Sequence, residues 1–170
     1  SAEEIWDLSS GTDVLNGAIG IWPFDRPQSG GTDGDFVIGW VSDSTVRYQL
    51  LQTDETKRGS LRTGPNGVNN RRAIEFNGTA HLYESTTAIT DLKHIVIAGK
   101  TGSSAFAADQ CLFAISDTGT TNKFFAIMID SAGKPVVEYS DGAAVDRIRG
   151  ETAIAGPDTN FTITVKVESG

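Results

Sequence analysis

The second half of the chain is a series of short segments in which apolar and polar residues alternate. Phe161–Val167 shows the pattern most clearly, because Phe161, Ile163, Val165 and Val167 fall on one face, with threonine and lysine on the other. A period of two is typical of a β-strand with one buried face. Similar segments, separated by turn-forming residues, predict four further strands: His94–Ala98, Gln110–Ser116, Lys123–Ile129 and Pro135–Ser140.

Two of these strands, His94–Ala98 and Lys123–Ile129, carry mostly apolar side chains on both faces. Such strands usually lie inside sheets that are covered on both sides. Strands spaced about 8–12 residues apart, with turns between them, indicate an all-β antiparallel sandwich.

Two hairpins are predicted in the first half of the chain. Ala73–Phe76 and Ala80–Tyr83 flank Asn77-Gly78, a pair that tolerates the positive φ angles of a two-residue turn. Phe36–Val41 and Thr45–Leu51 form the second candidate, joined by a short polar turn.

A polar, turn-rich loop at Thr53–Asn70 separates these two hairpins. Basic residues gather in and just after it, and the sequence leaves two interpretations open. They either contact an acidic partner or sugar, or they are solvated and balanced by nearby acids. These residues are Lys57, Arg58, Arg62, Arg71 and Arg72.

Residues 1–17 are predicted to form an N-terminal helical arm. Ser1 and Glu4 have the spacing of a capping box, and Ile5 and Leu8 fall on one helical face. A helix this short is marginal alone and needs a surface to pack on. That surface is either the protein's own sandwich or a neighbouring subunit. The apolar residues expected to dock the arm are Ile5, Trp6 and Leu8.

Length and charge exclude several classes of protein. The 170 residues suffice for one domain with a buried core, and the net charge of −8 repels phosphate backbones and anionic membranes. We therefore expect neither nucleic-acid binding nor membrane insertion. No apolar run approaches the ~20 residues of a spanning helix, and no signal-peptide pattern opens the chain.

Cys111, the single cysteine, shares a strand face with Phe113 and Ile115 and is predicted to be a buried core thiol.

Several segments together resemble the laminin-G-like, concanavalin A-like lectin/glucanase family. Gly20–Asp25 (GIWPFD) is similar to the aromatic-x-Phe-Asp strand of the family, and Ile74–Gly78 (IEFNG) to its Phe-Asn-Gly element. The glycine-turn hairpin at Lys123–Tyr139 fits a further element. His94–Ala98 and Phe161–Val167 occupy the places of two family strands, but lack the tryptophan and the Trp-His-His motif found there.

The resemblance implies a jelly-roll sandwich of two curved antiparallel sheets over residues 18–170. Relatives continue beyond the position of Gly170 with further strands. A sandwich without these last strands would carry an unpaired edge, and such edges recruit partners.

The resemblance also suggests calcium, because laminin-G-like domains often hold this ion through loop carboxylates. Asp25, Asp33 and Asp35 lie in one glycine-rich loop and are the candidate ligands. Turn formation is the alternative role for them. No other cofactor is expected.

Sugar binding would use exposed aromatic rings, which stack on pyranose faces. The candidate rings are Trp40, Tyr48 and Tyr83, with a role in the core as the alternative. The glucanases of this fold carry Glu-x-Asp-x-x-Glu on one strand, and no strand here has that spacing. Glycan hydrolase or lyase activity is therefore a remote alternative.

We expect a non-catalytic surface binding module, located on a virion surface or outside the cell. It is either a structural, decoration or tail component of a bacterial virus particle that can bind carbohydrate, or a free-standing carbohydrate-binding or adhesion domain. The opening residues, Ser1–Trp6, resemble the starts of phage virion proteins. The expected partners are other virion or self subunits and a cell-surface or matrix glycan.

Overall fold

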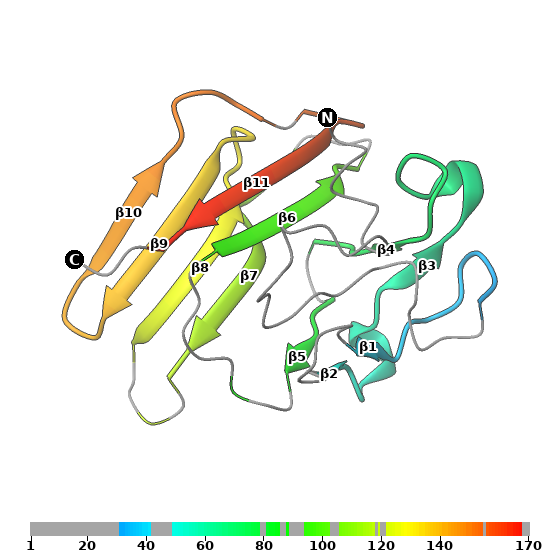
Figure 1. Cartoon of the computed structure of the whole chain (residues 1–170), viewed down its shortest axis with the longest axis horizontal. Helices are drawn as coiled ribbons and strands as arrows, with labels where there is room; N and C mark the ends of the chain where they lie inside the picture. The colour runs from blue at the N-terminus through cyan, green and yellow to red at the C-terminus, as the bar shows by residue number, and fades with distance from the viewer. Residues whose placement is uncertain are drawn as a thin grey trace. The chain divides into compact units, whose positions relative to one another are not determined.

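The structure, a computed structural model, forms two compact units, Ser1–Ala88 and Ile89–Gly170 (Figure 1). All strand pairs are antiparallel, and no α-helix occurs among the described residues. None of the helical turns among the described residues is long and apolar enough to span a membrane. The predicted N-terminal arm, residues 1–17, lies outside the described residues. The described residues are 31–41, 49–78, 81–85, 88, 94–102, 106–117, 119, 122–154 and 156–167.

The first unit contains two small sheets. One has the order β1-β2-β5, and the other pairs β3 with β4. Its core consists of Val37, Trp40 and Leu61, with Leu50, Ile74 and Tyr83 packed around them. The elements are β1 (Gly39–Val41), β2 (Gln49–Leu51), the 3₁₀ turn η2 (Glu55–Lys57), β3 (Ser60–Arg62), the 3₁₀ turn η3 (Gly64–Asn66), β4 (Ala73–Glu75) and β5 (Glu84–Ser85).

One predicted hairpin of this unit is confirmed and the other is wrong. β1 pairs with β2 as expected, but β4 pairs with β3 rather than with the segment after Asn77-Gly78. Asn77 instead closes a local loop. Its N–H donates to His81 Nδ1 over 3.1 Å, and its Oδ1 accepts from the His81 N–H over 3.2 Å. These bonds satisfy the backbone locally and compete with a strand ladder.

The second unit has two layers. A four-stranded sheet has the order β10-β9-β8-β7, and a two-stranded sheet pairs β11 with β6. Ile95 and Ile163 of the pair form one core with Ile127 and Ile129 of β8. The strands are β6 (His94–Lys100), β7 (Gln110–Ser116), β8 (Lys123–Ile129), β9 (Pro135–Asp141), β10 (Val145–Arg149) and β11 (Asn160–Lys166).

The alternating segments predicted most of these strands, and β7 and β8 have the predicted bounds. β8 lies between two neighbours and has no exposed side chain from Phe124 to Ile129, as expected for a strand with two apolar faces. For β6, the prediction that both faces are covered is wrong. It pairs only with β11 among the described strands, and Val96 on its outer face is 53% exposed. A strand in the outer layer of two is covered on one face only.

Two further side chains differ from the sequence-based expectation. Val167 is exposed because β11 ends at Lys166, one residue before it. Cys111 is exposed rather than buried. A β-bulge shifts the register of β7 between Cys111 and Phe113. The extra residue breaks the alternation that would have placed the two on one face.

Truncating the central strand should destabilise the second unit. Ile127 is fully buried between Phe113 and Val137 on the neighbouring strands. We expect Ile127→Ala to lower the free energy of unfolding by about 2–5 kcal/mol, because it removes buried methyl groups and leaves a cavity. Urea unfolding followed by far-UV circular dichroism measures the change. The control, Val96→Ala on an exposed face, should stay within about 0.5 kcal/mol. Equal losses in both variants would contradict the assignment of the core.

Candidate functional site

A trough crosses the ends of β7, β8 and β9 in the second unit. Its volume is about 390 Å³, within the roughly 300–1,000 Å³ typical of small-molecule sites. The lining residues fall into three rows that run across the strands. The rows are Ile115, Phe125 and Tyr139; Ser116, Phe124 and Ser140; and Asp117, Lys123 and Asp141.

The two outer rows form the walls of the trough. Side chains alternate along a strand, so the outer rows point to one face of the sheet and the middle row to the other. One wall is apolar, and its Tyr139 is 50% exposed. The other wall is charged, with Lys123 paired opposite Asp141. The trough can therefore contact an apolar surface and a polar edge of one ligand at the same time.

Local hydrogen bonds hold both carboxylates of the charged wall in place. Asp117 Oδ1 accepts from the Gly119 N–H, and Asp141 Oδ1 accepts from the Ala143 N–H, each over 2.9 Å. Asp117 is also tied to β8, because its N–H donates to the Lys123 carbonyl oxygen over 3.1 Å. The acceptors are thus set by turns at the strand ends, and a ligand would meet a preformed edge.

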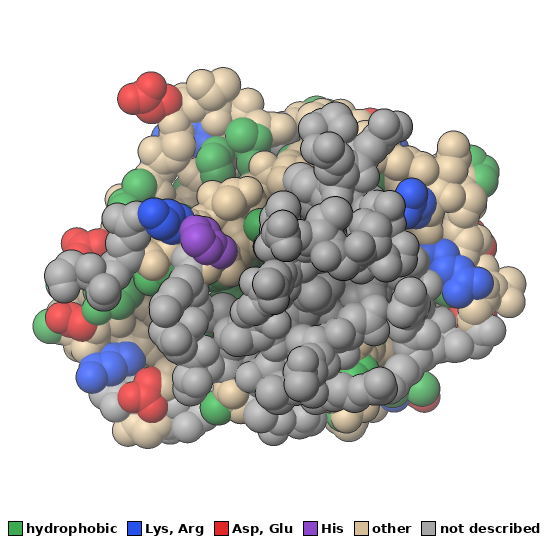
Figure 2. Space-filling view, in the orientation of Figure 1, with side chains coloured by type: hydrophobic (Ala, Val, Ile, Leu, Met, Phe, Trp, Pro, Cys, Tyr) green, Lys and Arg blue, Asp and Glu red, His purple; other side chains and the backbone are tan. Residues whose placement is uncertain are grey.

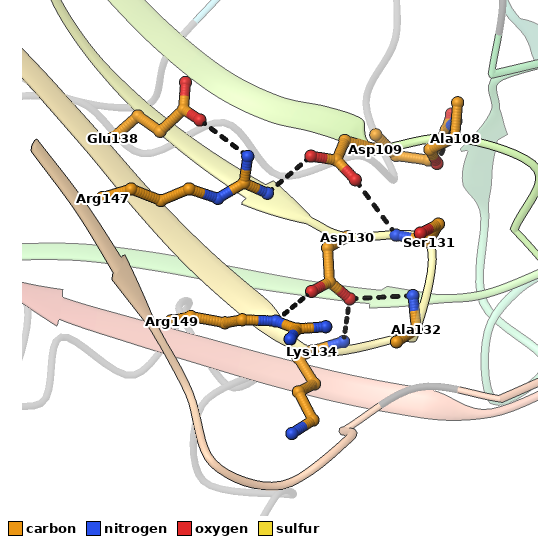
Figure 3. Close-up of polar contacts among 10 residues, drawn as sticks. Ala108, Asp109, Asp130, Ser131, Ala132, Lys134, Glu138, Arg147 and Arg149 are labelled. Atoms are coloured by element: carbon orange, nitrogen blue, oxygen red, sulfur yellow. Dashed lines mark hydrogen bonds and ion pairs between the residues drawn. The ribbon is translucent and has the colours of Figure 1, made fainter. Parts of the chain in front are cut away.

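The opposite face of the sheet carries a chain of ion pairs (Figure 3). Arg147 on β10 donates through Nη2 to Asp109 Oδ2 over 2.6 Å, and its Nη1 lies 3.1 Å from Glu138 Oε1 on β9. Arg149 donates through Nε to Asp130 Oδ2. All five residues of β10 are exposed. The strand is therefore held by its ladder with β9 and by these ion pairs, rather than by buried side chains.

Asp130 is the most enclosed member of this network, with 3% of the residue exposed. Its Oδ1 accepts from the N–H groups of Ala132 and Lys134, each over 2.9 Å, within the turn between β8 and β9. Burial by itself would raise the pKa of Asp130. The bonds from Lys134, Arg149 and Ala132 outweigh burial and hold that pKa below its ordinary value. The Asp109 pKa is also lowered, first by the Arg147 hydrogen bond and then by the Ser131 N–H.

Trp40 and Tyr83, two of the three aromatic residues named from the sequence, do not line the trough. Trp40 is 2% exposed and lies in the core of the first unit, so its ring faces are covered by the protein. Tyr83 packs edge-on against it, with ring centroids 4.5 Å apart. The Tyr83 hydroxyl donates to the Val37 carbonyl oxygen over 2.7 Å and accepts from the Gly59 N–H over 3.0 Å. Burial raises the Tyr83 pKa. Tyr48 lies outside the described residues.

The two described candidate calcium ligands, Asp33 and Asp35, each accept hydrogen bonds from nearby groups. Asp33 Oδ1 accepts from the Thr63 N–H over 2.7 Å, its Oδ2 accepts from Asn66 Nδ2 over 3.0 Å, and Arg62 lies 3.7 Å away. Donors and a cation on this carboxylate disfavour a second cation. Asp35 Oδ2 accepts from the Thr32 N–H over 2.9 Å, which is turn chemistry. No group of three potential metal-ligating side chains occurs among the described residues, and Asp25 lies outside them.

Three of the five basic residues named from the sequence have acidic neighbours. Lys57 lies 3.6 Å from Asp54, and Arg58 lies 3.2 Å from Glu55. Arg62 pairs with Glu75 as well as Asp33. On the face drawn in Figure 2, charged side chains of both signs likewise lie interspersed. For these three residues the balanced-loop interpretation holds.

Sequence reasoning missed the residues that line the trough. Tyr139 lies inside the predicted strand Pro135–Ser140 and Asp117 follows the predicted strand Gln110–Ser116, and the alternation marks neither position as part of a binding site. The alternation places Phe125 and Tyr139 on definite faces, but it does not show which part of a face stays uncovered.

Comparisons with known proteins add no assignment. No protein-family model, curated protein or solved structure matches the chain.

The ion-pair network should make stability depend on acid pH. Because the pKa of Asp130 is lowered on folding, its contribution is fully present above its unfolded value of about 4 and is lost as the pH falls through the folded value. We expect Asp130→Asn to unfold at lower urea concentration than the wild type at pH 7, with the difference shrinking below pH 4. Urea midpoints from pH 7 to 2 measure this. Asp141→Asn, outside the network, is the control, and a pH-independent difference for Asp130→Asn would contradict the linkage.

Proposed function

We propose that the chain is a non-catalytic carbohydrate-binding module and that the trough at the ends of β7, β8 and β9 is its sugar site. The observation that supports the proposal is the pairing of an apolar wall with a charged wall in one small-molecule-sized hollow. A pyranose ring has the same two-sided character. Its C–H face stacks on aromatic rings, and its hydroxyl groups bond to polar side chains.

The two walls suit different parts of a sugar. Tyr139, with its half-exposed ring, and the neighbouring Phe125 offer a stacking surface. Carboxylates accept two hydroxyl donors, and an ammonium group donates to hydroxyl oxygens. Asp141 and Lys123 would therefore select the orientation of the ring.

The proposed fold is the concanavalin A-like jelly-roll sandwich over residues 18–170. The two antiparallel layers of the second unit, with their shared isoleucine core, support it. We propose binding rather than hydrolysis, because the sequence lacks the alternating carboxylates of the glucanases and because Lys123 stands between Asp117 and Asp141 in the charged wall.

Removing the stacking ring should weaken sugar binding. We expect the wild-type chain to bind a defined set of glycans on an array, with or without chelator, because no metal is needed for the proposed contacts. Tyr139→Ala should raise the Kd for the best glycan at least tenfold, which corresponds to a loss of about 1.4 kcal/mol of binding free energy. Calorimetry measures this change. Tyr139→Phe keeps the ring and is the matched control. A blank array, or full binding by Tyr139→Ala, would contradict the proposal.

A second candidate function is a structural subunit of a bacterial virus particle or a similar surface assembly. The specific observation in its favour is β10, which is the last strand of its sheet among those described and is exposed at every residue. The apolar residues of the arm, Ile5, Trp6 and Leu8, are the proposed attachment points.

Assembly through the arm is testable on the full chain. Under this second function, we expect wild-type protein to form species larger than a dimer in sedimentation experiments, and Trp6→Ala to reduce them because it removes the largest apolar side chain of the arm. Glu3→Ala, a polar change in the same segment, should have no effect. Identical sedimentation of the wild type and Trp6→Ala would argue against docking by the arm.

A further inference from the structure

The edge strand β10 has an unusual combination of features. It is the end strand of the order β10-β9-β8-β7 among the described strands, and none of its five residues is buried. Ile148, near the end of this strand, is 74% exposed, and Val145 is 56% exposed. Edge strands with exposed apolar side chains are templates for pairing with another chain.

The backbone of β10 presents hydrogen-bonding groups to its outer side. The Gly150 N–H donates inward to the Pro135 carbonyl oxygen over 2.8 Å. Direction alternates along an antiparallel strand, so Ile148 and Asp146 also direct their N–H and C=O groups toward β9. Arg147 and Arg149 direct theirs away from it.

The charges of β10 do not protect this edge. Charged side chains normally keep edge strands apart. Here Arg147 is paired with Asp109 and Glu138, and Arg149 is paired with Asp130, all within the same sheet. A second copy would meet two neutralised arginines rather than two free charges.

We propose that two copies of this chain pair through β10, antiparallel and about a two-fold axis, with Ile148 opposite its own counterpart. In a two-fold antiparallel pair, the residues that lie opposite each other are on the same face of the sheet. The axis therefore passes next to one residue of β10, and this residue lies opposite its own copy. An axis at Asp146 would bring two carboxylates together, and an axis at Arg147 would place Ile148 against Asp146. An axis at Val145, the first residue of the strand, would leave most of β10 unpaired. Of the remaining registers, only an axis at Ile148 places apolar side chains opposite each other.

The backbone pattern agrees with this register. Arg147 then lies opposite Arg149 of the second copy, and the outward groups of both form a hydrogen-bonded pair. Ile148 occupies a non-hydrogen-bonded pair, in which the Cα atoms approach to about 4.5 Å and the side chains are closest. The two four-stranded sheets become one continuous sheet. Its two troughs lie on the same face, so a multivalent glycan could engage both. Pairing itself requires no sugar.

The first test is the oligomeric state of the full chain, measured by sedimentation equilibrium without sugar. We expect a dimer whose dissociation constant rises at least tenfold in Ile148→Asp, because the substitution places two carboxylates at the axis. Val96→Asp changes an exposed valine on β6 and is the matched control, which should dimerise like the wild type. A monomeric wild type, or a dimer unaffected by Ile148→Asp, would overturn the proposal.

The second test fixes the register. In a Cys111→Ser background, which removes the exposed native thiol, we expect Ile148→Cys to form a disulfide-linked dimer under mild copper-phenanthroline oxidation. A Cα separation of about 4.5 Å lies within the range for a disulfide. Asp146→Cys lies on the same strand face but opposite Gly150, so it should stay monomeric. Cross-linking of Asp146→Cys instead of Ile148→Cys would overturn the proposed axis. Both results are read on non-reducing gels and do not depend on the sugar site.

Discussion

The alternation of side chains along β8 sets the chemistry of both faces of the four-stranded sheet. Ile127 and Ile129 face Ile95 and Ile163 of the other layer, and these four residues form the core of the second unit. With those two positions pointing inward, Phe125 and Lys123 must point to the same side. A slip of one residue would turn the isoleucines away from Ile95 and Ile163 and would turn every neighbouring side chain to the wrong face. The core therefore fixes the trough.

Strand pairing carries this constraint outward to β9 and β10. Phe125 lies opposite Tyr139, so the tyrosine ring faces the trough. Ala126 lies opposite Glu138, and Glu138 lies opposite Arg147, so the ion pairs occupy the other face. Burial holds the centre of the sheet, whereas hydrogen bonds and ion pairs hold its β10 edge. Asp130 connects the buried centre of the sheet with its β10 edge, because it closes the turn after β8 and also binds Arg149 on β10.

The parts of the fold that the sequence predicted are those with strong alternation. β7 and β8 match within their bounds, and β11 is displaced by one residue. β10 was not predicted, because VDRIR has no buried side chain and so leaves no apolar period. The Asn77-Gly78 hairpin failed for a different reason. Gly78 does adopt a φ of 73°, as such a turn requires, but the partner of β4 is β3, which comes earlier in the chain. Turn chemistry identifies a bend and does not choose the strand pairing.

The candidate site was less predictable than the fold, because its residues form rows that run across several strands rather than one continuous segment of the sequence. Lys123 and Asp141 belong to β8 and β9, and Asp117 directly follows β7, so the three meet only through the pairing of β7 with β8 and of β8 with β9. Whether an aromatic ring is exposed depends on what packs over it, which the alternation along one strand does not show. Trp40 is covered and Tyr139 is not, although both lie in strands with apolar neighbours. The same partial cover that leaves Tyr139 open also leaves Ile148 open on the next strand, so the proposed sugar site and the proposed pairing edge have one structural origin. In this sheet, the buried core does not extend over β10 or over the end of β9 that carries Tyr139. These uncovered parts are available for binding.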